Sequence, residues 1–162
     1  MQYVLSLFRQ PVWISLFLPF RRAIAWFKSD ARHYQVVFQL SFLLYGIFAL
    51  GWEIPLLRFN IVILACLAVQ TLFILFKTKD WTGLKSALIT AFSLCLMLAA
   101  NSTWTFVLAA VLGISSKFFL KINGKHIFNP ANFGIMITLM VTGDAWISPG
   151  QWGSNAILLM LV

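Results

Sequence analysis

Residues Asn60–Phe76 read NIVILACLAVQTLFILF, an apolar run without a single charged side chain. Such a run is typical of a helix that crosses a membrane, because about 20 apolar residues span the ~30 Å hydrocarbon core. Four comparable runs occur elsewhere in the chain, at Val36–Trp52, Ser86–Ala100, Trp104–Phe119 and Ala131–Thr142. The sequence therefore predicts an all-α fold, a polytopic integral membrane protein with about five transmembrane helices.

A further apolar stretch, Asn155–Val162, closes the chain. At 1.5 Å per helical residue it would cover only about 12 Å, which is too short to cross a bilayer. We expect this stretch to be the start of a sixth helix, and the natural protein to be longer than the 162 residues given.

Composition excludes two other classes of protein. Of the 162 residues 61% are hydrophobic and 10% are charged, whereas soluble domains have about 45–50% apolar and about 25% charged residues. Disordered chains are poor in apolar and aromatic residues, so that class is excluded as well. The lipid bilayer is thus the first expected partner.

The net charge of +8 predicts orientation in the membrane and not nucleic-acid binding. With a cytoplasmic amino terminus, Arg58 would be the single basic residue outside, and lysine and arginine bias sets topology. The inner side would hold the other basic residues: Arg9, Arg21, Arg22, Lys28, Arg32, Lys77, Lys79, Lys85, Lys117, Lys121 and Lys125. We expect a multi-pass protein of the inner (plasma) membrane with its amino terminus in the cytoplasm.

The chain divides into two predicted regions. Residues 1–35 alternate basic and aromatic side chains, a pattern typical of an amphipathic helix that lies on the membrane surface. Residues 36–162 form the predicted transmembrane helical domain. In that domain the run Ala131–Thr142 is short and is preceded by Pro130, which favours a broken helix at a site inside the membrane.

The densest polar cluster is Lys117–Asn132, KFFLKINGKHIFNPAN. Asn129 is placed to cap a helix that starts with Pro130, where the missing proline N–H costs nothing. The amino terminus of a helix attracts anions, and Lys125 and His126 would add positive charge there. The cluster is therefore a candidate receptor for a phosphate, a quinone oxygen or a flavin ring, or else an ordinary capped helix beside inner-loop lysines.

The remaining polar residues and the cysteines give weaker indications of a functional site. Asp144 lies in the outer loop Gly143–Ser154, which reads as a turn with interfacial tryptophans, although the carboxylate could instead attract a cation at a pore mouth. Cys66 and Cys95 lie inside apolar runs without a Cys-x-x-Cys pair, so they give no metal or disulfide signal. The sequence contains no hydrolase or phosphate-loop motif.

Three segments together resemble the NqrB/RnfD family, membrane subunits of the sodium-pumping NADH:quinone oxidoreductase and of the Rnf electron-transport complex. The segments are Ser115-Ser116-Lys117, Gly124–Gly134 (GKHIFNPANFG) and Gly143–Gly153 (GDAWISPGQWG). The resemblance implies a helical subunit of about ten spans, built around broken helices as in urea transporters. It also implies electron transfer through flavin to quinone or to partner membrane subunits, coupled to ion movement.

The same resemblance implies a set of cofactor-binding positions: Lys125, His126, Asn129, Pro130 and Asn132. The family attaches FMN to the threonine of a Ser-Gly-Ala-Thr motif, and residues 1–162 do not contain that motif. No attachment residue, catalytic residue or metal ligand is therefore assigned.

Two alternatives remain open from the sequence. Asn129-Pro130-Ala131 is also the signature of water and glycerol channels, which would make the protein a passive small-solute channel. Those channels usually have Ser-Gly-x-His before the first Asn-Pro-Ala and a second copy of it, and both are missing here. Alternatively, residues 1–162 are mainly a scaffold for chemistry located elsewhere in the protein.

Overall fold

The computed structural model describes residues 21–22, 24–52 and 56–148. Contacts divide the chain into two units, Met1–Tyr34 and Gln35–Val162. The predicted start of a sixth helix, Asn155–Val162, lies outside the described residues, as does most of the predicted surface segment 1–35. Each unit is therefore described by itself.

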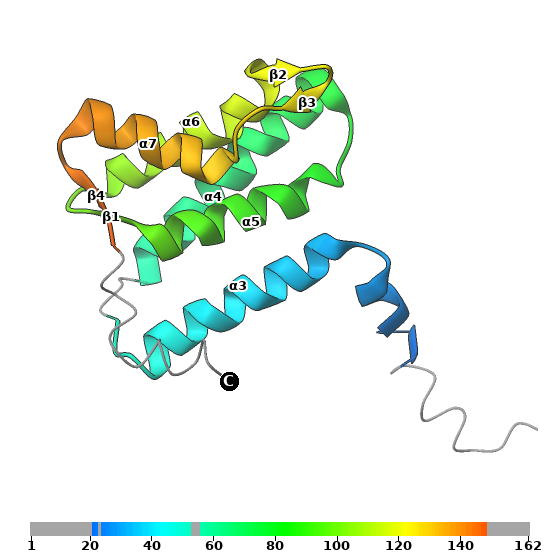
Figure 1. Ribbon diagram of the computed structural model, residues 1–162, viewed down its shortest axis with the longest axis horizontal. Helices are drawn as coiled ribbons and strands as arrows, with labels where there is room; N and C mark the ends of the chain where they lie inside the picture. The colour runs from blue at the N-terminus through cyan, green and yellow to red at the C-terminus, as the bar shows by residue number, and fades with distance from the viewer. Residues whose placement is uncertain (1–20, 23, 53–55, 149–162) are drawn as a thin grey trace, which may run out of the picture. The chain divides into compact units, whose positions relative to one another are not determined.

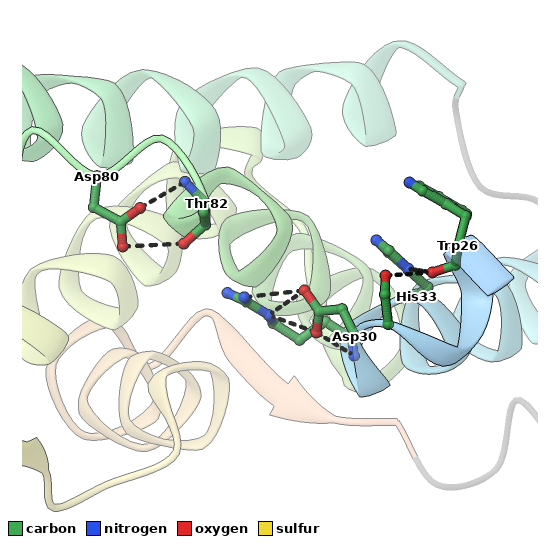
Figure 2. Close-up of polar contacts among 7 residues, drawn as sticks. Trp26, Asp30, His33, Asp80 and Thr82 are labelled. Carbon is green, nitrogen blue, oxygen red and sulfur yellow. Dashed lines mark hydrogen bonds and ion pairs between the residues drawn. The ribbon is translucent and has the colours of Figure 1, made fainter.

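In the first unit, residues 24–28 are helical, and a turn leads into helix α3 (Ala31–Phe48). Asp30 precedes this helix and accepts a hydrogen bond from the backbone N–H of Arg32 at 3.0 Å, while its carboxylate also pairs with the Arg32 guanidinium at 3.0 Å. The ring of His33 stacks on Trp26 at 3.7 Å, and its Nδ1 lies 3.0 Å from the Trp26 carbonyl oxygen (Figure 2). Aromatic and charged side chains thus fix the turn.

The second unit contains α3 from Gln35 onward and four further helices. Helix α4 (Leu56–Phe73) continues into the π-helical turn η1 (Ile74–Thr78), and it is followed by α5 (Gly83–Met97), α6 (Thr103–Phe119) and α7 (Pro130–Thr142). The predicted all-α fold is confirmed, with short strands added at the helix ends. Figure 1 shows these strands as two pairs, one at each end of the α6–α7 pair.

One strand pair replaces the predicted end of a helix. The apolar run Ser86–Ala100 is helical only to Met97, and Leu98–Ala100 forms strand β1. This strand pairs antiparallel with β4 (Ala145–Ile147), with Ala99 opposite Trp146. The run contains no glycine or proline to end the helix; pairing with β4 supplies the backbone partners instead.

The other pair is a hairpin in the polar cluster. Strands β2 (Lys121–Ile122) and β3 (Lys125–His126) are joined by Asn123 and Gly124, which have φ of 51° and 78°. Positive φ at both central residues is the geometry of a two-residue hairpin turn, and Asn-Gly is its preferred sequence. The hairpin places Lys121 opposite His126.

Helices α6 and α7 pack closely because small residues face each other. A Cβ added at Gly113 would lie 2.6 Å from the carbonyl oxygen of Pro130, and one added at Gly134 would collide with the carbonyl oxygen of Ala109. Ala110 and Ala131 are buried in the same core. Small residues at a contact let two helix backbones approach each other, as in membrane helix pairs.

Among the described residues, one helix is long and apolar enough to cross a membrane. It is Leu56–Thr78, with 23 residues, a mean hydropathy of 2.4 and 28% of its apolar window buried. Helices α5, α6 and α7 are apolar but shorter, with 15, 17 and 13 residues. By length and composition, then, one of the five predicted spans passes as a crossing helix.

Candidate functional site

A pocket of about 190 Å³ lies where α4 and η1 end, α5 begins, and α6 runs into the β2–β3 hairpin. Its lining is mostly polar and includes two lysines, one histidine and one aspartate, beside one phenylalanine and two glycines. The lining residues are Gln70, Thr78, Asp80, Gly83, Ser86, Lys117, Phe118, Lys121, Gly124 and His126. This end of the second unit therefore gathers side chains that are far apart in the sequence.

Two residues of the pocket lining are joined by a hydrogen bond between two helices. Lys117 on α6 donates from Nζ to Oε1 of Gln70 on α4 at 2.8 Å. Gln70 is 3% exposed, so its amide needs partners inside the protein. Gly83 provides room for that amide, because a Cβ at this position would lie 2.7 Å from Gln70 Nε2. The result is a lysine fixed by a buried amide and not extended into solvent.

Two ammonium groups converge on one aromatic ring. Lys117 Nζ lies 6.0 Å and Lys121 Nζ 5.7 Å from the centre of the Phe118 ring. Phe118 is itself held by stacking on Phe73, with ring centres 4.0 Å apart. Because cross-strand neighbours lie on the same face of a hairpin, His126 faces the pocket with Lys121. The electrostatic character of the pocket is positive.

Asp80 is the acidic side chain of the lining, and its carboxylate is bonded within its own turn. Oδ1 accepts a hydrogen bond from the backbone N–H of Thr82 at 2.9 Å, and Oδ2 accepts one from the Thr82 hydroxyl at 3.0 Å (Figure 2). Thr82 is the residue before α5. The carboxylate therefore anchors the start of that helix.

The five predicted site residues do not form one site. His126 lines the pocket, whereas Lys125 belongs to the opposite face of the hairpin, because successive strand residues point to opposite sides. Asn129 caps α7, its Oδ1 accepting hydrogen bonds from the backbone N–H groups of Ala131 at 3.0 Å and Asn132 at 3.5 Å. Pro130 occupies the first turn of α7, and Asn132 is exposed.

The predicted capped start of α7 is thus confirmed, while Lys117, Lys121 and Gln70 were not predicted as site residues. Both lysines belong to the predicted polar cluster Lys117–Asn132, but the prediction assigned the added positive charge to Lys125 and His126. The signal that could have found the lysine–histidine pair is the Asn123-Gly124 turn, which sets residues 121 and 126 opposite each other.

The pocket is too small for a whole flavin. Pockets for drug-sized ligands have volumes of roughly 300–1,000 Å³, and this one has about 190 Å³. The charged side chains of its lining are two lysines and one aspartate. We therefore derive no redox step through these residues.

A second polar network lies at the opposite end of α6. Asp144 accepts hydrogen bonds from the Thr105 hydroxyl at 2.6 Å, from the Ser102 backbone N–H at 3.1 Å and from Asn101 Nδ2 at 3.1 Å. The bonds from Thr105 and then Ser102 lower the pKa of Asp144. The Asp144 carboxylate therefore holds the start of α6. These hydrogen bonds explain its position without a bound cation.

Arg58 completes this network from α4. Its guanidinium donates to the carbonyl oxygens of Ala100 at 3.0 Å and Asn101 at 3.1 Å, and it lies 5.2 Å from the centre of the Phe106 ring. These carbonyls belong to the last residue of strand β1 and to the residue after it, where the backbone has left the helix. Arg58, which we expect to be the single basic residue outside, therefore holds an irregular backbone segment in place through these hydrogen bonds.

Other candidates for chemistry are sparse in the part of the chain that the structure describes. There, no three His, Cys, Asp or Glu side chains come together as a metal site. Cys66 and Cys95 are buried, free thiols. Comparison of the chain with protein-family models, with curated proteins and with solved structures gives no match.

Proposed function

We propose that this chain is a membrane subunit of an ion-translocating electron-transport complex, similar to the NqrB/RnfD subunits. In this proposal it is a multi-pass protein of the inner (plasma) membrane, and the complex carries electrons through flavin toward quinone or partner subunits. The observation that carries the proposal is the position of the family-like segment Gly124–Gly134. It forms the hairpin strand β3 and the capped start of the short helix α7.

The exposed apolar surface supports a bilayer environment. The helix Leu56–Thr78 has only 28% of its apolar window buried, whereas a core helix of a soluble protein is mostly buried. Leu57 and Phe76 on this helix are 72% and 86% exposed, and Met140 on α7 is 74% exposed. Soluble monomers rarely leave such large apolar surfaces open to water.

The charges of the second unit support an orientation. Its six lysines lie in the segments around the pocket end: Lys77, Lys79, Lys85, Lys117, Lys121 and Lys125. Arg58 is at the other end, bonded to backbone carbonyls. A lysine-rich end belongs on the cytoplasmic side by the positive-inside rule, which agrees with a cytoplasmic amino terminus.

The short helices support a transporter-like frame. Helices α6 and α7, with 17 and 13 residues, reach about 26 Å and 20 Å at 1.5 Å per residue. Buried extended backbone follows α5 at strand β1. Short helices joined to irregular backbone are typical of membrane proteins with a site inside the bilayer, where neighbouring protein surrounds the irregular part.

The experiment is purification of the protein with its native partners from membranes. We expect it to remain in the membrane pellet after alkaline carbonate, to copurify with other membrane subunits, and to show flavin absorption with electron transfer from NADH or reduced ferredoxin. In-gel flavin fluorescence after denaturation tests covalent attachment. A colourless complex without electron transfer would refute the proposal, and osmotic swelling of proteoliposomes without a redox partner would favour the solute channel.

A further inference from the structure

We infer that one face of the β2–β3 hairpin inserts into the lipid headgroup layer at the cytoplasmic boundary of the membrane. The hairpin thereby anchors the pocket end of the second unit to the bilayer surface. This inference rests on the membrane location in the proposed function, but not on electron transfer. The inserting face, called the isoleucine face below, consists of Leu120, Ile122, Lys125 and Ile127.

The first argument is that the two faces of the hairpin differ in chemistry. Lys121 pairs with His126, and both residues line the pocket. The N–H of Ile127 donates to the carbonyl oxygen of Leu120 at 3.2 Å, which continues the strand pairing by one residue on each side. Because successive strand residues point to opposite sides, the isoleucine face is directed away from the pocket.

The second argument is the exposure of this face. Ile122 is 62% exposed and Ile127 50% exposed, and Phe128, the residue after the hairpin, is 50% exposed. Leaving such apolar area in water is unfavourable, and insertion between lipid headgroups removes it from water. A membrane interface therefore stabilises the hairpin in the conformation that the structure shows.

The third argument is the depth at which the hairpin lies. The helix Leu56–Thr78 has 23 residues and is about 34 Å long at 1.5 Å per residue, which is enough to cross the ~30 Å hydrocarbon core. Its last residue, Thr78, lines the same pocket as Lys121 and His126 of the hairpin. The hairpin therefore lies at the level where this helix leaves the hydrocarbon core, which is the level of the headgroups.

The fourth argument is charge, and it favours lipid over a protein partner. Lys125 belongs to the isoleucine face, and Lys77 and Lys79 are exposed at the end of the crossing helix. Trp81 and Phe119 are exposed at the same end. Lysines beside exposed aromatic side chains are typical of the cytoplasmic interface, where they attract anionic headgroups. A protein partner would have to bury the Lys125 ammonium group together with the isoleucines, whereas a headgroup layer accepts both.

The test measures the depth of spin labels on the full chain in vesicles of phosphatidylcholine and phosphatidylglycerol. The two cysteines of the chain, Cys66 and Cys95, are buried, so the unsubstituted chain serves as the labelling control. Ile122→Cys carries the label on the isoleucine face, and Lys121→Cys is the matched control on the opposite face. We expect the label at Ile122 to collide more with oxygen, which is concentrated in lipid, than with a water-soluble nickel complex. At Lys121 this order should reverse.

Ile127→Cys and His126→Cys repeat the comparison on strand β3 and its continuation, so the test does not depend on the folding of one variant. Leu64→Cys reports the bilayer itself, because Leu64 is 65% exposed on α4. Equal readings on the two faces of the hairpin would overturn the inference. Shielding of the labels at Ile122 and Ile127 from both reagents would overturn it as well, because it would mean that protein covers this face.

The same labels separate this inference from the proposed function. Lipid contact at Leu64 with water contact at Ile122 and Ile127 would overturn the inference and leave the membrane location intact. Water contact at Leu64 would refute the membrane location and the inference with it. A colourless protein with lipid contact at Ile122 and water contact at Lys121 would refute electron transport alone.

Discussion

The carboxylate of Asp144, just after α7, accepts a 2.6 Å hydrogen bond from the hydroxyl of Thr105 in the first turn of α6. This bond joins the end of one helix to the beginning of its neighbour. Together with the β1–β4 pair, it closes the end of the second unit opposite the pocket.

Asp144→Asn is expected to destabilise the protein and to make its stability less dependent on pH in the acidic range. The folded-state pKa of Asp144 is lowered, chiefly by the Thr105 bond, while an unfolded aspartate titrates near ~3.9. The ionised carboxylate therefore stabilises the fold above that value, and the contribution is lost as pH falls through the lowered pKa. Melting temperatures in detergent, measured from neutral to acidic pH, should show this loss in the wild type and not in the variant.

Thr105→Val provides the control for that pH effect, because it removes the donor and leaves the carboxylate in place. Its acid transition should move to higher pH, toward the ordinary range of aspartate. An unchanged transition would mean that another group governs the acid sensitivity.

Gly113→Ala should lower stability by about 1–3 kcal/mol, the usual cost of overpacking a tight contact. The new methyl would lie 2.6 Å from the Pro130 carbonyl oxygen, a backbone atom that cannot move without shifting the start of α7. Denaturant titration in detergent would measure the loss. Ser115→Ala on the same helix is the comparison, and equal effects in both variants would rule out close helix contact as the cause.

Asn129→Ala should cost about 1 kcal/mol, because the first N–H groups of α7 lose their side-chain acceptor. Asn129→Ser retains an oxygen at that position and should be close to the wild type. The readout is again the free energy of unfolding. A serine variant as unstable as the alanine variant would show that Asn129 does more than cap the helix.

The Gln70–Lys117 bond can be isolated with a double-mutant cycle. Lys117→Met leaves the buried Gln70 carbonyl without its lysine donor, which is expected to cost about 1–3 kcal/mol. Combining it with Gln70→Leu should cost less than the sum of the two single losses, since both partners of the bond are then removed. Additive losses would show that the two side chains contribute independently.

The helical frame was predictable because its signals are local. Apolar runs with at most one charged residue located α3 to α7, and Asn129-Pro130 placed the start of α7. The end of α5 was not predictable, since Leu98–Ala100 becomes a strand only by pairing with β4, a segment more than forty residues away. The pocket was missed for a similar reason. Gln70 and Lys117 look like an ordinary polar residue and an ordinary loop lysine until the fold brings them within 2.8 Å.

The turn between strands β2 and β3 is a local signal in the sequence, because Asn-Gly is the preferred pair for a two-residue hairpin turn. Gly124 has φ of 78°, a conformation that favours glycine, and open space surrounds the position of a Cβ. Gly124→Ala should therefore act through backbone strain alone, at a cost of about 1–2 kcal/mol. The strained turn should also disturb the pairing of Lys121 with His126 across the hairpin. Asn123→Gly should preserve stability, since glycine accepts the φ of 51° found there. Denaturant titration in detergent measures both variants, and a Gly124→Ala protein as stable as the wild type would show that the positive φ at this turn does not require glycine.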